Sequence, residues 1–323
     1  EFTFDGQLGR IYNNLQLAAR IDFPTRIPTS YRFMASISTF DYYKEEKLFS
    51  NNDNPAFNKK KEEFVKIKAA LPFLSRKKAE FGIGIARIQD RYFQTNIIDF
   101  SQAKHDRSTY DILGGSIVLE GSTLNARQFA TQGSREKMAA QIFTGRGNPQ
   151  APVENQYKKI QSWLQVSYEN ETYHKISPKF TLGAYLEAYY SSRNFSNNYT
   201  ATLMEAGEFA PTAHSKVTYN EAFRANQYTG IGAIPIYQLG NSIQLRGEFY
   251  GFIPIFPIKK DEYGKAYYGK AFTKFEYLGE ISLVFQLSFG SISAYVNHYS
   301  SPNNDWNVGL TLGWQLFNSR FIE

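Results

Sequence analysis

Residues 307–316 read NVGLTLGWQL, and every second side chain in this stretch is apolar. The apolar side chains share one face of an extended strand, and the other face carries small and polar ones. A strand of about ten residues with this alternation is typical of a membrane-spanning β-barrel, in which one face contacts lipid. The lipid-facing positions predicted here are Val308, Leu310, Leu312, Trp314 and Leu316.

The same alternation recurs along the chain and predicts an all-β, antiparallel transmembrane barrel over a single domain, residues 1–323. Two clear examples place outward Phe180, Leu182, Ala184, Leu186, Ala188 and Tyr190, and then Phe275, Tyr277, Gly279, Ile281, Leu283 and Phe285, with Lys274, Glu276, Glu280 and Ser282 inward. Fourteen strands are predicted, at 1–11, 14–24, 29–43, 58–73, 78–94, 107–122, 134–146, 158–174, 179–195, 227–239, 242–256, 271–288, 291–300 and 306–321.

The connections between these strands alternate between tight turns and mostly longer polar loops, which is the plan of an outer-membrane barrel with its short turns in the periplasm. Both termini are then expected in the periplasm. Aromatic pairs near strand ends match the girdles at the two membrane interfaces. The pairs are Tyr42-Tyr43, Tyr92-Phe93, Tyr189-Tyr190 and Tyr267-Tyr268, and the longer loops are 44–57, 95–106, 147–157, 196–226, 257–270 and 301–305.

Composition supports a barrel and argues against other classes. Aromatic residues make up 16% of the chain and mean hydropathy is −0.44, while no run approaches the roughly eighteen apolar residues that a membrane helix needs. A soluble β-sandwich is the alternative, but its strands would have about five or six residues. The net charge of +6 comes from Lys and Arg that are scattered or in loops, so we expect attraction to outer-membrane lipid and lipopolysaccharide, with no nucleic acid partner.

Two segments resemble motifs of the BamA-like barrel superfamily of outer-membrane assembly and secretion proteins. The first is Gln128 to Arg135, in which Phe129, Thr131, Gly133 and Arg135 match a Phe-Pro-Thr-x-Gly-x-Arg segment, with Ala130 in place of the proline. The second contains Phe223, Arg224, Asn226, Gln227 and Tyr228, where the family has an Arg-Gly-Phe/Tyr motif on a loop that folds into the lumen. The resemblance implies sixteen strands, two more than can be read here, and a lumen-folded loop at about 196–226.

The chain is most similar to the C-terminal barrel of patatin-like phospholipases from the Bacteroidetes. The similarity lies in the sequence of residues 223–228 and in the later segment Leu245-Arg246-Gly247-Glu248-Phe249-Tyr250. The resemblance implies a monomeric barrel that anchors or translocates its own N-terminal passenger, a lipid acyl hydrolase. Such enzymes use a Gly-x-Ser-x-Gly nucleophile elbow, which this chain lacks. Catalysis is therefore expected outside this chain, and any signal peptide or upstream domain is expected to precede Glu1.

An arginine on a loop inside a barrel needs a carboxylate partner, because an unpaired charge in a low-dielectric interior is costly. The alternation of residues 243–250 turns Glu248 inward, two strands after the loop. We therefore predict a bidentate pair between Arg224 and Glu248 that locks the loop as a plug. An exposed loop arginine is the alternative.

No catalytic or metal-binding constellation can be read from the chain, and no cofactor is expected. Cysteine is absent, and the histidines, His105, His174, His214 and His298, lie in predicted loops, at a turn or near the outer interface, without a serine–histidine–acid pattern. The polar stretch 51–54 is interpreted as an ordinary loop and not as a metal site. A stand-alone pore or a transporter of hydrophobic substrates is the second functional class, consistent with inward Lys66, Lys68, Arg246, Glu248, Glu276 and Glu280.

Overall fold

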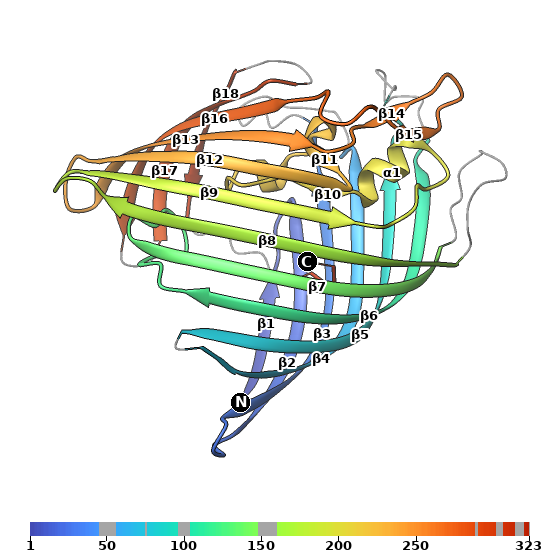
Figure 1. The fold of residues 1–323 in the computed structure, drawn as a ribbon, viewed down its shortest axis with the longest axis horizontal. Coiled ribbons are helices and arrows are strands. Elements are labelled where there is room, and N and C mark those ends of the chain that lie inside the picture. Colours follow the sequence, from blue (N-terminus) through green and yellow to red (C-terminus); the bar gives the residue numbers. More distant parts are fainter. Residues whose placement is uncertain are drawn as a thin grey trace.

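The computed structural model describes residues 1–44, 56–74, 76–95, 104–147, 160–287, 290–301, 306–313 and 320–322. Within them, fourteen antiparallel strands form one sheet in chain order, which curls into a barrel-shaped wall (Figure 1). No pairing joins β1 to β18 in these ranges, so the sheet is not closed. The strands are β1 (Phe2–Gln7), β2 (Tyr12–Phe23), β3 (Thr29–Tyr42), β4 (Asn58–Phe73), β5 (Lys77–Tyr92), β6 (Asp106–Ser122), β7 (Gly133–Gly147), β8 (Ile160–Lys175), β9 (Phe180–Ser191), β12 (Gln227–Gln238), β13 (Ile243–Pro254), β16 (Glu276–Leu287), β17 (Gly290–Tyr299) and β18 (Trp306–Leu312).

Each predicted strand corresponds to one strand of this sheet, so the all-β barrel fold is confirmed. The described residues contain no further strand of the main sheet, and the count of sixteen implied by the family resemblance stays a prediction. The connections at 24–28, 176–179 and 239–242 are tight turns, whereas 43–57, 93–105 and 192–226 are long. We call the two ends of the sheet the short-turn end and the long-loop end.

Alternation along the strands places apolar side chains on the outer face, as predicted. Val308, Leu310 and Leu312 are 57–80% exposed, whereas Gly309 between them is buried. The predicted outward positions Trp314 and Leu316 lie outside the described residues. So large an exposed apolar area marks a surface that contacts lipid or another protein. Its members include Leu17, Ile67, Ile83, Ile85, Leu113, Ile142, Leu245 and Ile281.

The end of the chain differs from the prediction, because the strand expected at 306–321 stops at Leu312 in β18. Residues 320–322 lie on the inner face of the sheet instead. The buried ring of Phe321 packs between those of Phe64 and Phe143, and its backbone N–H donates to Oε1 of Glu62 at 2.7 Å. Phe321 is 1% exposed, so its aromatic side chain belongs to the interior of the sheet.

Other predicted strands are also shorter than expected, and two of these differences have a visible cause. The strand expected at 271–288 begins only at Glu276, because Phe272 has a φ of +54°, which breaks the extended backbone. The strand expected at 179–195 ends at Ser191, where the chain turns inward. The predicted loop 257–270 contains a hairpin of β14 (Ile258–Lys260) and β15 (Ala266–Tyr268).

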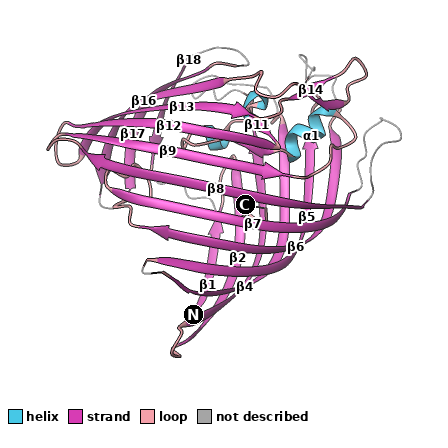
Figure 2. Ribbon diagram, in the orientation of Figure 1, coloured by secondary structure: helices cyan, strands magenta, loops and turns pink. Residues whose placement is uncertain are grey.

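Helical segments are few and lie within the curve of the sheet (Figure 2). They are α1 (Tyr199–Glu205) and two single turns, η1 (Ser215–Val217) and η2 (Glu221–Phe223), and all three belong to the segment between β9 and β12. In the part of the chain that is described, no helix has the length and apolar character needed to cross a membrane.

Candidate functional site

Residues 192–226 fold back against the inner face of the sheet, and we call this segment the plug. It contains α1, η1, η2 and a short pair formed by β10 (Gly207–Glu208) and β11 (Arg224–Ala225). Figure 1 shows these elements enclosed by the curve of the strands. Most plug side chains are buried, among them Leu203, Phe209, Tyr219, Phe223 and Ala225, each at most 3% exposed.

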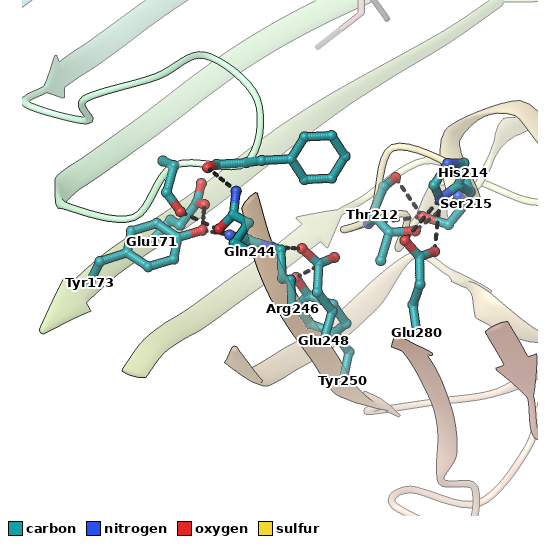
Figure 3. Close-up of polar contacts among 12 residues, drawn as sticks. Glu171, Tyr173, Thr212, His214, Ser215, Gln244, Arg246, Glu248, Tyr250 and Glu280 are labelled. Atoms are coloured by element: carbon teal, nitrogen blue, oxygen red, sulfur yellow. Dashed lines mark hydrogen bonds and ion pairs between the residues drawn. The ribbon is translucent and has the colours of Figure 1, made fainter. Parts of the chain in front are cut away.

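Local hydrogen bonds explain why the plug adopts a defined structure. Asn198 caps α1, because its side-chain oxygen accepts from the backbone N–H of Ala201 at 2.7 Å. Thr212 and Ser215 bond each other reciprocally before η1, with each hydroxyl accepting from the other's backbone N–H at 3.0 Å (Figure 3). The backbone N–H of Phe209 donates to the carbonyl of Phe223 at 2.9 Å, which extends the β10–β11 pair.

Arg224 is buried in the plug, and its partner is Glu208. Its Nη2 lies 2.5 Å from Oε1 of Glu208, its Nη1 donates to the carbonyl of Leu203 at 3.4 Å, and its guanidinium lies over the ring of Tyr219. The predicted partner Glu248 forms its ion pair with Arg246, two residues away on β13. The predicted Arg224–Glu248 pair is therefore wrong, because each charge is neutralised by a nearer carboxylate or guanidinium.

The remaining residues of the loop motif, Phe223 and Asn226 to Tyr228, connect the plug with neighbouring strands. The ring of Phe223 packs against Phe209 and Phe252. Asn226 donates to the hydroxyl of Tyr268 at 2.9 Å, which ties the plug to the β14–β15 hairpin. Gln227 and Tyr228 begin β12, and the Tyr228 hydroxyl donates to Glu187 at 2.5 Å and to the carbonyl of Glu208 at 3.1 Å.

Arg193, which forms a buried ion pair within the plug, anchors the first half of the plug to the wall formed by β6 and β8. Nη2 of Arg193 lies 3.1 Å from Oε2 of Glu205, and both side chains are 7% exposed. The guanidinium lies over the rings of Trp163 and Tyr110, at 4.5 and 4.8 Å from their centroids. Burial raises the pKa of Glu205, while the charge of Arg193 opposes that shift.

His214 anchors the second half of the plug to the opposite wall. Its Nδ1 lies 2.9 Å from both carboxylate oxygens of Glu280 on β16 (Figure 3). Its Nε2 lies 2.7 Å from the hydroxyl of Thr311 on β18. The ring of Tyr295 on β17 stacks on the imidazole. The plug thus spans the inside of the sheet from β6 and β8 to β16, β17 and β18.

A second inward segment lies at the short-turn end, where residues 123–132 connect β6 to β7; we call it the mouth turn. Asn125 organises it, since its side-chain oxygen accepts from the backbone N–H groups of Thr131 and Gln132 at 2.9 and 3.1 Å. Gly133 has a φ of +91°, and a Cβ there would lie 2.1 Å from the carbonyl oxygen of Thr123. This family-motif glycine is therefore required by the backbone.

The mouth turn is held from across the barrel by β13 and β16. Arg246 donates to the carbonyl of Ala130 at 2.8 Å, and the side-chain amide of Gln244 donates to the carbonyl of Phe129 at 3.3 Å (Figure 3). The side-chain amide of Gln286 donates to the same carbonyl of Phe129 at 3.1 Å. Arg135, the last motif residue, is the third residue of β7, and its Nη1 lies 3.1 Å from Oε1 of Glu169.

One apolar cluster connects the mouth turn with the plug. Its members are Ala130, Tyr173, Phe209, Ala222, Phe223, Ala225, Tyr228, Ile234, Ile236, Tyr250, Phe252 and Leu278, all at most 6% exposed. Seven of these side chains come from the wall and the others from the two inward segments. The interior of this half of the barrel is therefore packed with side chains, as a protein core is.

A curled antiparallel wall with an inward plug and an inward mouth turn defines a plugged β-barrel. The comparison with solved structures agrees: BamA from Haemophilus ducreyi, in a form lacking POTRA domains 1–3, superposes with a TM-score of 0.62 at 10% identity over 95% of this chain. This chain spans 62% of that one. CdiB from Acinetobacter baumannii gives a TM-score of 0.47 at 8% identity, covering 93% of this chain and 50% of that one.

At such low identity the likeness to BamA shows the fold alone. No model of a known protein family matches the sequence. No curated protein matches it either.

The motif segments identified in the sequence overlap the plug and the mouth turn, but the residues that hold them were missed. Glu208, Glu205, Arg193 and His214 were not singled out as contacts, although Glu280 was predicted to face inward. The missing signal lies in the plug itself, where Glu208 pairs with Arg224 through the two-residue strands β10 and β11. Strands so short leave no readable alternation in a sequence.

Proposed function

We propose that this chain is a plugged barrel of the bacterial outer membrane that anchors or translocates a patatin-like lipid acyl hydrolase, whose catalytic domain lies outside these residues. The short turns face the periplasm in this proposal. Phe2 of β1 and Leu312 of β18 both lie toward the short-turn end, because they pair with residues of β2 and β17 near those turns. The barrel is monomeric and contacts outer-membrane lipid and lipopolysaccharide.

The plug is the observation that supports an anchor or a gated translocator over an open pore. A barrel of fourteen strands is wide enough for an aqueous channel when nothing fills it. Here the plug is anchored on both sides by Arg193 and His214, and its aromatic side chains pack against the wall. The patatin part rests on the resemblance of residues 223–228 and 245–250.

Conductance in planar bilayers tests the plugged state. We expect the chain to show rare, small openings, and a variant in which residues 194–225 are replaced by a short Gly-Ser linker to conduct at least about tenfold more. Heat-modifiable migration on gels checks that the shortened barrel still folds. A steady large conductance of the unmodified chain would contradict the plug and favour the stand-alone pore.

The proposed hydrolase activity has to be tested on the full-length protein. An antibody against the barrel should precipitate, from outer membranes, an activity that releases fatty acid from a fluorogenic phospholipid. Membranes that contain only residues 1–323 are the matched control and should yield none. If the full-length precipitate also releases no fatty acid, the patatin assignment is removed while the barrel itself is unaffected.

A further inference from the structure

Six cationic side chains gather on the outer wall of β4, β5, β6 and β7 at the long-loop end; we call this group the rim patch. Strand register places them in three adjacent rows, below which the same strands carry only apolar or small outward side chains as far as the short-turn end, except for Lys77 and Glu136. The members are Lys59, Lys61, Arg87, Arg91, Arg107 and Arg146.

The top row of the rim patch contains three cations on three consecutive strands. Lys59, Arg91 and Arg107 are direct cross-strand neighbours, and like charges in such positions repel one another. Asp41, at the end of the row, lies 3.7 Å from Lys59. Among the described residues, no carboxylate lies within ion-pair distance of Arg91 or Arg107. Within the described ranges, the row therefore holds positive charge at Arg91 and Arg107 that no carboxylate pairs with.

The lower rows are closer to balance. Lys61 pairs with Glu63 at 2.6 Å, and Arg87 pairs with Asp111 at 2.6 Å, next to the exposed Arg146. In the described part of the patch, six cations thus share three carboxylates, those of Asp41, Glu63 and Asp111. The adjacent His105 responds to this field, because burial and the charges of Lys59 and Arg91 lower its pKa.

The rim patch borders the exposed apolar surface of the same strands. A lipid bound there could place its head group at the patch and its acyl chains on the apolar surface. Directly below it on the same strands lie Val65, Ile83, Ile85 and Leu113, which are 38–59% exposed. On the opposite wall, the outward positions of β12, β13 and β16 carry no Lys or Arg. Among the outward positions of these two sets of strands, the cations therefore lie only on the wall of β4–β7.

We propose that the rim patch binds the phosphate groups of a phosphorylated lipid of the outer leaflet, with its acyl chains lying along β4–β6. This inference rests on the proposed membrane location. A guanidinium binds phosphate with two parallel hydrogen bonds, and Arg91 and Arg107 lie opposite each other on neighbouring strands. A phosphate placed over them would neutralise the repelling row. Basic residues next to an apolar band attract anionic head groups in this way.

Binding of lipid A to the purified full chain in neutral detergent tests the site, with native mass spectrometry counting bound lipid. We expect diphosphorylated lipid A to bind at least about tenfold more tightly than its dephosphorylated form. The triple variant Lys59→Gln, Arg91→Gln, Arg107→Gln should lose that preference. A control that removes the same charge at the same end, Lys259→Gln, Lys260→Gln, Lys270→Gln, lies on the far side and should keep it.

Equal binding of the two lipid forms by the unmodified chain would overturn the site, and so would equal losses in the two triple variants. The first comparison needs no mutation, so it decides the matter even if the rim variant fails to fold. Insertion into phosphatidylcholine vesicles is measured in parallel. A chain that inserts but shows no phosphate preference overturns the lipid site alone, whereas a chain that does not insert overturns the membrane proposal as well.

Discussion

At the scale of single residues, the buried arginines of the interior each find a carboxylate within their own segment. Arg193 pairs with Glu205 and Arg224 with Glu208, all four in the plug, while Arg246 pairs with Glu248 on β13. The plug is thus neutralised internally before it meets the wall. Its attachment then depends on stacked rings, on apolar packing, on the contact of His214 with Glu280, and on the ammonium group of Lys274, which donates to the carbonyl of Ala222.

Replacing Arg193 with alanine should loosen the plug. The change removes one partner of a buried pair and leaves the carboxylate of Glu205 without it, which costs about 3–5 kcal/mol in comparable cases. Hydrogen exchange of the amides of α1 measures this free energy. Arg20→Ala, at an exposed ion pair, is the control and should change it by less than 1 kcal/mol, roughly. Unchanged α1 protection in Arg193→Ala would contradict the anchoring role.

The same variant should make attachment of the plug depend on pH. Burial raises the pKa of Glu205 in the docked plug, so the stability linked to this carboxyl is complete at low pH and is lost as pH rises through the raised pKa. Arg193 opposes the shift, and its removal raises that pKa further. Exchange of α1 in Arg193→Ala should therefore accelerate more than in the unmodified chain as pH rises above the ordinary titration range of a carboxyl group, after correction for intrinsic exchange rates. Parallel pH profiles would remove this explanation.

The partner of Arg224 can be tested by a double-mutant cycle. We expect Arg224→Gln and Glu208→Gln to couple by about 1.5 kcal/mol or more, since the pair is buried and direct. Arg224→Gln and Glu248→Gln should add independently to within about 0.5 kcal/mol. Urea unfolding in detergent provides the free energies. Coupling to Glu248 in place of Glu208 would restore the pairing predicted from the sequence.

At the scale of elements, the strands could be predicted because their outer face is apolar and their inner face carries polar side chains. Successive side chains point to opposite faces, so the sequence alternates with a period of two. Fourteen strands were readable for that reason. The plug carries no such period, since it is buried on all sides and its elements have two to seven residues. Its position between β9 and β12 was predictable from length, but its contacts depend on folding in three dimensions.

The mouth turn gives a prediction at this scale. Gly133→Ala should destabilise the barrel by about 1–3 kcal/mol, because alanine is strained at a φ of +91° and its Cβ would meet the carbonyl of Thr123. Gly240→Ala is the matched control, since a Cβ there meets nothing within 4 Å. Urea midpoints of the two variants give the comparison, and equal midpoints would show that the mouth turn tolerates a side chain.

At the scale of the whole molecule, the outer surface defines a band of exposed apolar side chains bounded by the rim patch. The apolar band could be predicted from the alternation of apolar and polar residues alone. The rim patch was not, because its members are far apart in the sequence and only strand register brings them together. From the sequence the same cations were considered scattered.

The depth of this band can be measured by charge substitution. Ile83→Arg, in the middle of β5, should destabilise the barrel by about 2–4 kcal/mol in a phosphatidylcholine bilayer. Thr109→Arg, also outward but level with Lys61 of the rim patch, should cost about 0–1 kcal/mol. Denaturant titration in vesicles reports both. Similar small costs at both positions would mean that β5 and β6 do not face hydrocarbon.

The apolar cluster between plug and mouth turn also sets the thermal behaviour of the interior. Withdrawing the plug would wet the rings of Phe209, Phe223, Tyr228 and Phe252 while leaving the strand ladder intact. Hydration of newly exposed apolar area raises heat capacity. Plug release would then appear in a calorimeter as a heat-capacity step without loss of β-structure, a signature by which an inner gate can be told apart from collapse of the barrel that surrounds it.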